Sequence, residues 1–200
     1  MLTTIQVSNL PPPIFSMLDL LSQICDAVSS SVVPLESSDS VDDYKGFLGV
    51  IDWRIRSLLT SKATDGNGDA SDDAVLIMQL YQLAMLLYLN RSTEGLIDQP
   101  IRTQQHIDKA FVLFPQLSSC KQQFPIFVIG CEARTDEQRA VVLDVISRTE
   151  KLSSSRSFNY CKRILQAVWA QDDLAYGNNI SYRDKLTSVM SHCKIVPTFV

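Results

Sequence analysis

The stretch LIMQLYQLAMLLYLN, residues 76–90, is the most apolar part of this 200-residue chain. It contains many strong helix formers, so it predicts a helix from about Asp72 to Asn90. Its apolar residues fall on nearly all sides of that helix, which indicates a central helix that is buried on most sides. The apolar run from Val75 to Leu89 is shorter than the about 20 residues of a membrane span, so we expect no membrane crossing.

The residues before this stretch predict a helix followed by a loop. One face of the helix is apolar at helical spacing and is formed by Ile14, Leu18, Leu21, Cys25 and Val28. The run 29–40 is rich in serine and predicts a loop. We therefore treat residues 1–40 as an N-terminal helix and loop, either inside the main domain or leading into it. Residues 41–200 form the main domain.

The rest of the chain also has helical periodicity. A helix is predicted from about Asp42 to Thr60, with Phe47 among its inward residues. A short apolar element that begins at Phe124 fits a strand or a helix by period alone. A capping box, Thr135-Asp136-Glu137-Gln138, predicts the start of another helix. A later stripe is formed by Phe158, Cys161, Leu165, Val168 and Trp169. The prediction is an all-α fold, a single domain built as an irregular array of about seven or eight helices.

Composition and charge exclude several classes of function. Hydrophobic residues make up 46% and charged residues 20% of the chain, which supports a buried core and argues against global disorder. The formal net charge is −4, whereas a self-sufficient nucleic-acid binder usually carries a basic surplus. We therefore expect no direct nucleic-acid contact by this chain. No run matches the glycine-rich loops that hold nucleotide phosphates.

The five cysteines do not follow a metal or disulfide pattern. They are odd in number and widely spaced, so we interpret them as small buried apolar residues in a reducing compartment. Two functional roles are the alternatives to burial. Cys131 could be a nucleophile with His106 as its base, and His192 with Cys193 could begin a metal site. Glu132 would raise the pKa of the Cys131 thiol, and adjacent residues on a helix point about 100° apart. We therefore predict no catalytic residue, no metal ligand and no cofactor in this chain.

The segment FPIFVIGCEA, residues 124–133, carries the most specific pattern in the sequence. Phe124-Pro125 fixes the entry into a helix, because proline presets φ and fits a first turn. Gly130 lacks a side chain, which allows another helix to cross closely at that point.

Glu132 is the unusual residue of this segment, since a carboxylate at the end of an apolar helix needs a partner. Arg134 and Arg139 are nearby in sequence, and we favour an ion pair that holds two helices together. The alternative is a polar contact inside a ligand pocket.

The segment 124–133 resembles the sequence aromatic-Pro-Leu-Phe-Ile-Ala-Gly-Cys-Glu-Ala of the fungal-specific transcription factor domain, which is the regulatory region of fungal zinc-cluster transcription factors. The resemblance covers roughly residues 40–200 and includes a tryptophan in the helix after the second serine-rich loop. The residues that carry it, as structural or pocket residues, are Phe124, Pro125, Phe127, Gly130, Cys131, Glu132, Ala133 and Trp169.

The resemblance implies a nuclear, all-helical regulatory domain that controls RNA polymerase II transcription and has no enzyme activity. In that family a separate N-terminal cluster of six cysteines binds zinc and DNA. This chain has no such cluster, so it is either a fragment of a longer factor or a relative that lost the cluster.

The partners that the resemblance implies are proteins of the transcription machinery or a small-molecule effector, with a homodimer as a further option. Two alternatives come from other classes of protein. One is an α-helical protein-interaction scaffold without a DNA-binding role, and the other is an enzyme built on a helical array.

Overall fold

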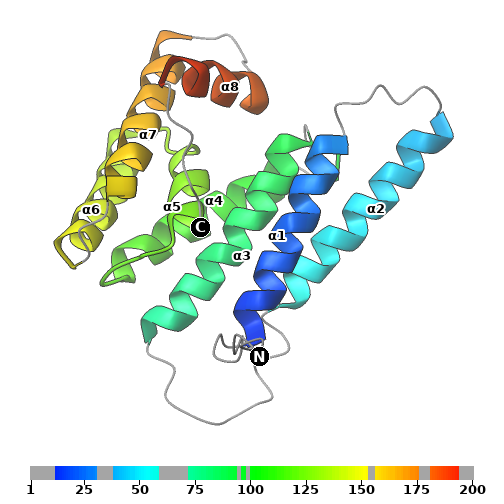
Figure 1. The fold of residues 1–200 in the computed structure, drawn as a ribbon, viewed down its shortest axis with the longest axis horizontal. Helices are drawn as coiled ribbons and strands as arrows, with labels where there is room; N and C mark the ends of the chain where they lie inside the picture. Colours follow the sequence, from blue (N-terminus) through cyan, green and yellow to red (C-terminus); the bar gives the residue numbers. More distant parts are fainter. Residues whose placement is uncertain are drawn as a thin grey trace, which may run out of the picture.

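The computed structural model describes residues 12–30, 38–58, 72–93, 96–97, 100–152, 156–175 and 181–193. These residues form an all-α fold with no strand among them (Figure 1). The elements in chain order are α1 (Pro12–Ser30), α2 (Ser38–Ser57), α3 (Asp72–Ser92), α4 (Pro100–Leu113), the short 3-10 helix η2 (Phe114–Gln116), α5 (Gln123–Gly130), α6 (Asp136–Leu152), α7 (Arg156–Leu174) and α8 (Tyr182–Cys193).

Helix α3 is the centre of the fold. It packs against α1 and α2 on one side and against α4, α5 and α8 on the other, and Figure 1 shows it between these two groups. Residues 83–87 are buried without interruption, which confirms the predicted burial on most sides. By length and hydropathy alone the segment Asp73–Ser92 would be long and apolar enough to cross a membrane. Its packing against five other helices is that of a core helix.

Helix α1 turns a different face to the core than the one predicted. Leu18 and Cys25 are exposed although they were expected inward, and the side chain of Ile14 lies outside the described residues. The face is therefore rotated by about one residue, or about 100°. Apolar residues occur on both faces of α1, so packing against α2 and α3 selects the buried one, which consists of Met17, Leu20, Ile24 and Ala27.

Helix α2 lies at the edge of the bundle and packs against α1 and α3 (Figure 1). It starts at Ser38, before its predicted start, and residues 59–60 of its predicted end lie outside the described part of the chain. Phe47 was predicted inward, but its side chain is 49% exposed, because only one side of an edge helix meets neighbours. The domain division at residue 40 remains a prediction, and α2 spans that position.

The segment 124–130 belongs to helix α5 and is buried on all sides, against α3, α6 and α7. Pro125 occupies its first turn, where a missing N–H costs no hydrogen bond. The period alone left a strand and a helix open, and the structure has the helix. The predicted stripe of α7 is also buried along its whole length.

Gly130 lies where α5 packs tightly against two neighbouring helices. A Cβ atom placed on Gly130 would lie 2.9 Å from both methyl carbons of Leu165 and 3.3 Å from a methyl carbon of Val142. These two residues belong to α7 and α6, so three helices converge on one glycine. Both neighbours are fully buried, so a larger residue at this position must displace their side chains or push the helices apart.

We expect the substitution Gly130→Leu to destabilise the protein by about 1–3 kcal/mol or more, because it overpacks this junction. The same substitution at Gly49 is the matched control, since a Cβ atom there meets nothing within 4 Å. Gly49→Leu should stabilise α2 by up to about 1 kcal/mol through helix propensity. Urea denaturation of both variants measures the two effects, and equal midpoints would contradict the close crossing.

Candidate functional site

The aromatic residues of the 124–133 segment attach α5 to the central helix. The ring of Phe124 stacks on Tyr81 with centroids 5.8 Å apart and meets Tyr88 edge to face at 6.0 Å. Both tyrosines belong to α3. Phe127 is buried as well, so the segment presents no aromatic side chain to solvent. Its aromatic residues therefore act in packing, and the polar residues after α5 are the candidates for chemistry.

Glu132 lies in the connector that follows α5, and only 2% of its surface is exposed. Its two carboxylate oxygens accept hydrogen bonds from Nε and Nη2 of Arg91 at 2.9 and 2.8 Å. The hydrogen bond to Glu132 raises the pKa of Arg91. The prediction that Arg134 or Arg139 would be the partner of Glu132 is wrong, because both arginines are held by acids of α7. An ion pair that joins two segments is present, but it connects the connector to α3.

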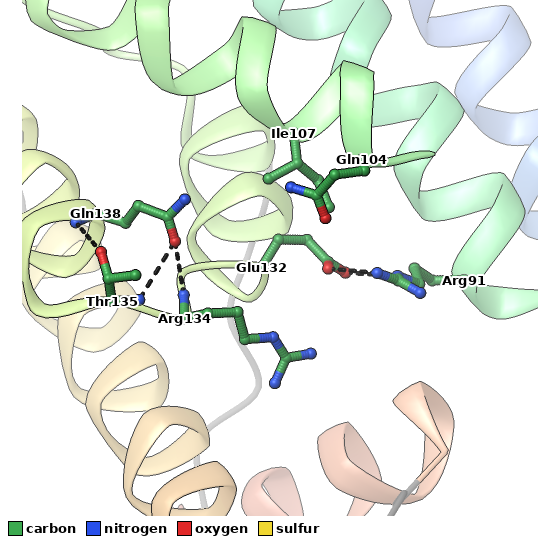
Figure 2. Close-up of a pocket in the computed structure, with 7 residues that line it drawn as sticks. All are labelled: Arg91, Gln104, Ile107, Glu132, Arg134, Thr135 and Gln138. Atoms are coloured by element: carbon green, nitrogen blue, oxygen red, sulfur yellow. Dashed lines mark hydrogen bonds and ion pairs between the residues drawn. The ribbon is translucent and has the colours of Figure 1, made fainter. Parts of the chain in front are cut away.

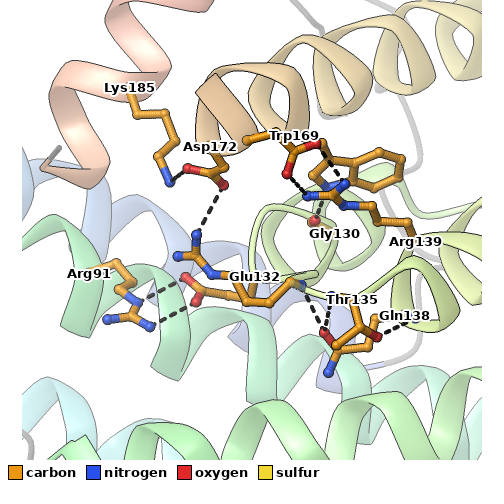
Figure 3. A network of polar contacts seen from close by, with 11 residues as sticks. Arg91, Gly130, Glu132, Thr135, Gln138, Arg139, Trp169, Asp172 and Lys185 are labelled. Atoms are coloured by element: carbon orange, nitrogen blue, oxygen red, sulfur yellow. Dashed lines mark hydrogen bonds and ion pairs between the residues drawn. The ribbon is translucent and has the colours of Figure 1, made fainter. Parts of the chain in front are cut away.

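Arg134 joins the same connector to α7 and α8. Its guanidinium lies 3.1 Å from the carboxylate of Asp172, and Lys185 contacts the other oxygen of that carboxylate (Figure 3). Lys185 is itself buried. Two adjacent acids in a helix, Asp172 and Asp173, are typical of a solvated face, but the side chain of Asp172 is only 11% exposed. Asp172 therefore connects three segments of the chain.

A second arginine fixes α6 to α7. Arg139 donates to both carboxylate oxygens of Asp173 at 2.9 and 2.7 Å, which raises the pKa of Arg139 and lowers that of Asp173. The same guanidinium lies 5.7 Å from the ring centroid of Trp169, within cation–π range. The indole N–H of Trp169 donates to the carbonyl oxygen of Gly130 at 2.8 Å. Trp169 thus links the end of α5 to the arginine of α6.

The predicted capping box opens α6. The amide of Gln138 donates to the hydroxyl oxygen of Thr135 at 3.3 Å, and the side-chain oxygen of Gln138 accepts from the amides of Thr135 and Arg134 at 3.3 and 2.8 Å. This arrangement satisfies orphan donors at the helix start and fixes the connector between α5 and α6.

A cavity of about 260 Å³ lies beside this connector (Figure 2). Two arginines and one glutamate face it, so its charged lining carries a net charge of +1. Ile107 supplies an apolar wall, and threonine and glutamine side chains add hydrogen-bonding groups. Such a lining suits a small ligand with an anionic or hydrogen-bonding group. The residues that line the cavity are Arg91, Gln104, Ile107, Glu132, Arg134, Thr135 and Gln138.

Cys131 is a poor candidate for a nucleophile. Burial, and then the charge of Glu132, hold the pKa of its thiol well above its ordinary value, so the reactive thiolate is disfavoured. Among the described residues, no three His, Cys, Asp or Glu side chains are grouped so that they could hold a metal ion. The side chains of His192 and Cys193 lie outside the described part of the chain.

Comparison with known proteins identifies the family. The profile of the fungal specific transcription factor domain matches residues 6–193. The chain belongs to this family. A similar curated protein is the transcription factor iacI of Pestalotiopsis fici, which is 65% identical over 195 residues, covering 98% of this chain. The chain spans about half of the length of that relative, 49%. No solved structure matches the chain.

Several residues of the site were not predicted from the sequence. They are Arg91, Gln104 and Lys185, of which the first holds Glu132 and the last holds Asp172. A signal exists for Arg91, because it follows directly after the most apolar run of the chain. For Gln104 and Lys185 the local sequence carries no comparable signal, since each is one polar residue in an amphipathic helix.

Removing Arg91 should reduce the stability of the fold more than neutralising Glu132. Arg91→Ala leaves a buried carboxylate without its partner, so we expect a loss of about 3 kcal/mol. Glu132→Gln leaves an arginine that water reaches, since 37% of the Arg91 side chain is exposed, and the loss should be about 1 kcal/mol. Arg163→Ala on the exposed side of α7 is the control, with an effect within about 0.5 kcal/mol. Chemical denaturation measures the stability of all three variants. A larger loss of stability for Glu132→Gln than for Arg91→Ala would contradict the argument that an unpaired buried carboxylate is the more costly change.

The buried thiols should make the protein sensitive to alkaline pH. Burial raises the pKa of Cys161 to about 12 and that of Cys120 to about 11, from an ordinary value of 9.0. Because the folded state favours the protonated thiols, their contribution is complete below about pH 9 and is lost as the pH rises toward the folded values. Each thiol then removes about 1.4 kcal/mol of stability per pH unit above 9.

We expect Cys161→Ala to reduce the loss of stability between about pH 8 and pH 10 by roughly 1.4 kcal/mol. Cys25→Ala is the control. Partial burial also raises the pKa of this thiol on α1, but less than that of Cys161, so most of the loss should remain. Urea midpoints at the two pH values measure the effect. If wild type and Cys161→Ala lose the same stability between the two pH values, ionisation of Cys161 is not a cause of the alkaline sensitivity.

Proposed function

We propose that this chain is the effector- or partner-responsive regulatory domain of a fungal zinc-cluster-type transcription factor that controls RNA polymerase II transcription in the nucleus. Family membership and the 65% identity to a protein called a transcription factor support the role in transcription. Both point to a transcription factor rather than to an enzyme. The observation that carries the response to an effector is the polar cavity beside the Glu132 connector.

The position of this cavity suits a regulatory site. Its walls include Arg91, which binds Glu132, and Arg134, which binds Asp172 on α7. A small ligand with a carboxylate or phosphate group would add hydrogen bonds to these arginines and so change the balance of the ion pairs that join α3, α7 and α8. A ligand shifts a conformational equilibrium only through such differential contacts.

Zinc and DNA belong to another segment in this proposal. The zinc cluster of the family uses six cysteines at short spacing, whereas this chain carries five dispersed cysteines. Its net charge of −4 also disfavours binding to the phosphate backbone of DNA. We therefore place both roles in the part of a longer factor that this chain does not contain, and we expect proteins of the transcription machinery or a small molecule as its partners.

A reporter assay tests the proposal through the cavity. The chain is fused to a heterologous DNA-binding module in a filamentous fungus, and transcription from the matching promoter is followed across growth conditions. Gln104→Trp fills the cavity from α4, so we expect reporter output that no longer changes with growth condition. The neighbouring Gln105→Trp is the matched control, because Gln105 is exposed and does not line the cavity.

Protein level and thermal stability of both variants are compared with the wild type, so that loss of fold is distinguished from loss of response. A wild-type fusion without any effect on transcription would refute the regulatory role. Equal responses of wild type and Gln104→Trp would refute the cavity as the effector site.

A further inference from the structure

We propose that the outward face of α2 is a self-complementary docking surface on which a second copy of this chain packs antiparallel, α2 against α2. This inference is independent of the effector cavity, which lies between α3, α4 and the connector before α6. Figure 1 shows α2 on the outer side of the bundle, with α1 and α3 on its inner side.

The outward face of α2 is apolar where a solvated helix face is normally polar. Phe47, Val50 and Trp53 are 49%, 54% and 68% exposed. At 100° per residue, Phe47 and Trp53 lie about 60° to either side of Val50, so the three side chains form one stripe. Large aromatic residues in an exposed cluster are typical of protein interfaces, in which Trp contributes strongly to affinity.

Gly46 adds a hollow to the same face. A Cβ atom placed on it would meet nothing within 4 Å among the described residues, so the fold of one copy does not require a glycine there. A mid-helix glycine destabilises a helix relative to alanine. Its place beside the apolar stripe fits a position where a bulky side chain of a second molecule packs against the backbone.

The charges on this face identify the second molecule as another copy of the chain. Asp43 precedes the apolar stripe and Arg54 follows it, and both residues are exposed and lie within about 40° of Val50 around the helix. Arg54 also donates from one guanidinium nitrogen to Oε1 of Gln23 on α1 at 2.7 Å, so an ion pair with a second molecule would use its other guanidinium N–H groups. The first turns of α2 are acidic and its last turn holds Arg54 and Arg56. Two copies that pack antiparallel bring the acidic start of one helix opposite the basic end of the other. A parallel arrangement would bring like charges together.

The apolar residues match in the same antiparallel register. With Asp43 opposite Arg54 of the second copy, Phe47 lies opposite Val50 of that copy. Trp53 then falls close to Gly46 of the second copy, where the aromatic ring fills the hollow left by the glycine. A two-fold axis repeats each of these contacts, as an isologous interface requires. One helix face is smaller than the roughly 800 Å² that each partner gives to a standard interface, so we expect a dimer of micromolar affinity.

Sedimentation velocity of the 200-residue chain over the micromolar concentration range tests the proposal. We expect a monomer–dimer equilibrium that Trp53→Asp weakens by about 30-fold or more, the effect of losing an interface hot spot. Leu174→Asp is the matched control, since Leu174 is 86% exposed on α7 and lies outside the proposed surface, and it should leave the equilibrium unchanged. A chain that remains monomeric throughout this range would overturn the proposal.

A charge exchange tests the register. Asp43→Arg alone and Arg54→Asp alone each place like charges opposite one another, so each should lose the dimer. In an equimolar mixture, the heterodimer has opposite charges at both ends of the interface, so it should form although neither variant dimerises with itself. Circular dichroism establishes that each variant is folded. Dimers that persist in both single variants, or a mixture that stays monomeric, would refute the antiparallel α2 surface.

Discussion

A carboxylate that is removed from water must be matched by a cation with good hydrogen-bond geometry. The buried carboxylate of Glu132 therefore requires the fold to bring an arginine to it. The residue is 2% exposed, and the two hydrogen bonds from Arg91 satisfy both of its oxygens. Because Arg91 lies at the end of α3, the pair fixes the end of the central helix against the connector after α5. Replacing a whole buried ion pair by apolar residues of similar volume is often neutral for stability, whereas removing one partner alone is costly. The pair therefore constrains how α3 meets the connector more than it adds net stability.

The other polar contacts of the site extend from this connector. Arg134 contacts Asp172 on α7, and Asp172 in turn contacts Lys185 on α8. The capping box then starts α6 directly after Arg134. Gly130 brings the backbone so close to α7 that the indole of Trp169 can reach its carbonyl oxygen. The short connector 131–135 therefore determines how α3, α6, α7 and α8 meet. These contacts share one short connector, so each of them limits where the others can form.

Much of the fold could be predicted from local patterns. The apolar run of α3, the stripe on α7 and the capping box of α6 are decided by neighbours within two turns of helix, and the structure has them as expected. The burial of Glu132 was also implied by its position next to an apolar helix. The partner of Glu132 could not be predicted, because Arg91 is 41 residues away in sequence and no local feature favours it over Arg134.

The same reason explains the two misplaced faces. In α1, periodicity supports two overlapping faces, and only packing against α2 and α3 decides between them. In α2, periodicity places Phe47 inward, but an edge helix has neighbours on one side only. The exposed tryptophan at position 53 has one further consequence. The chain carries two tryptophans, one in water on α2 and one in the core beneath Arg139. Their fluorescence emission separates by environment, so the protein contains its own optical probes, one of its outer surface and one of the junction that holds α5, α6 and α7 together.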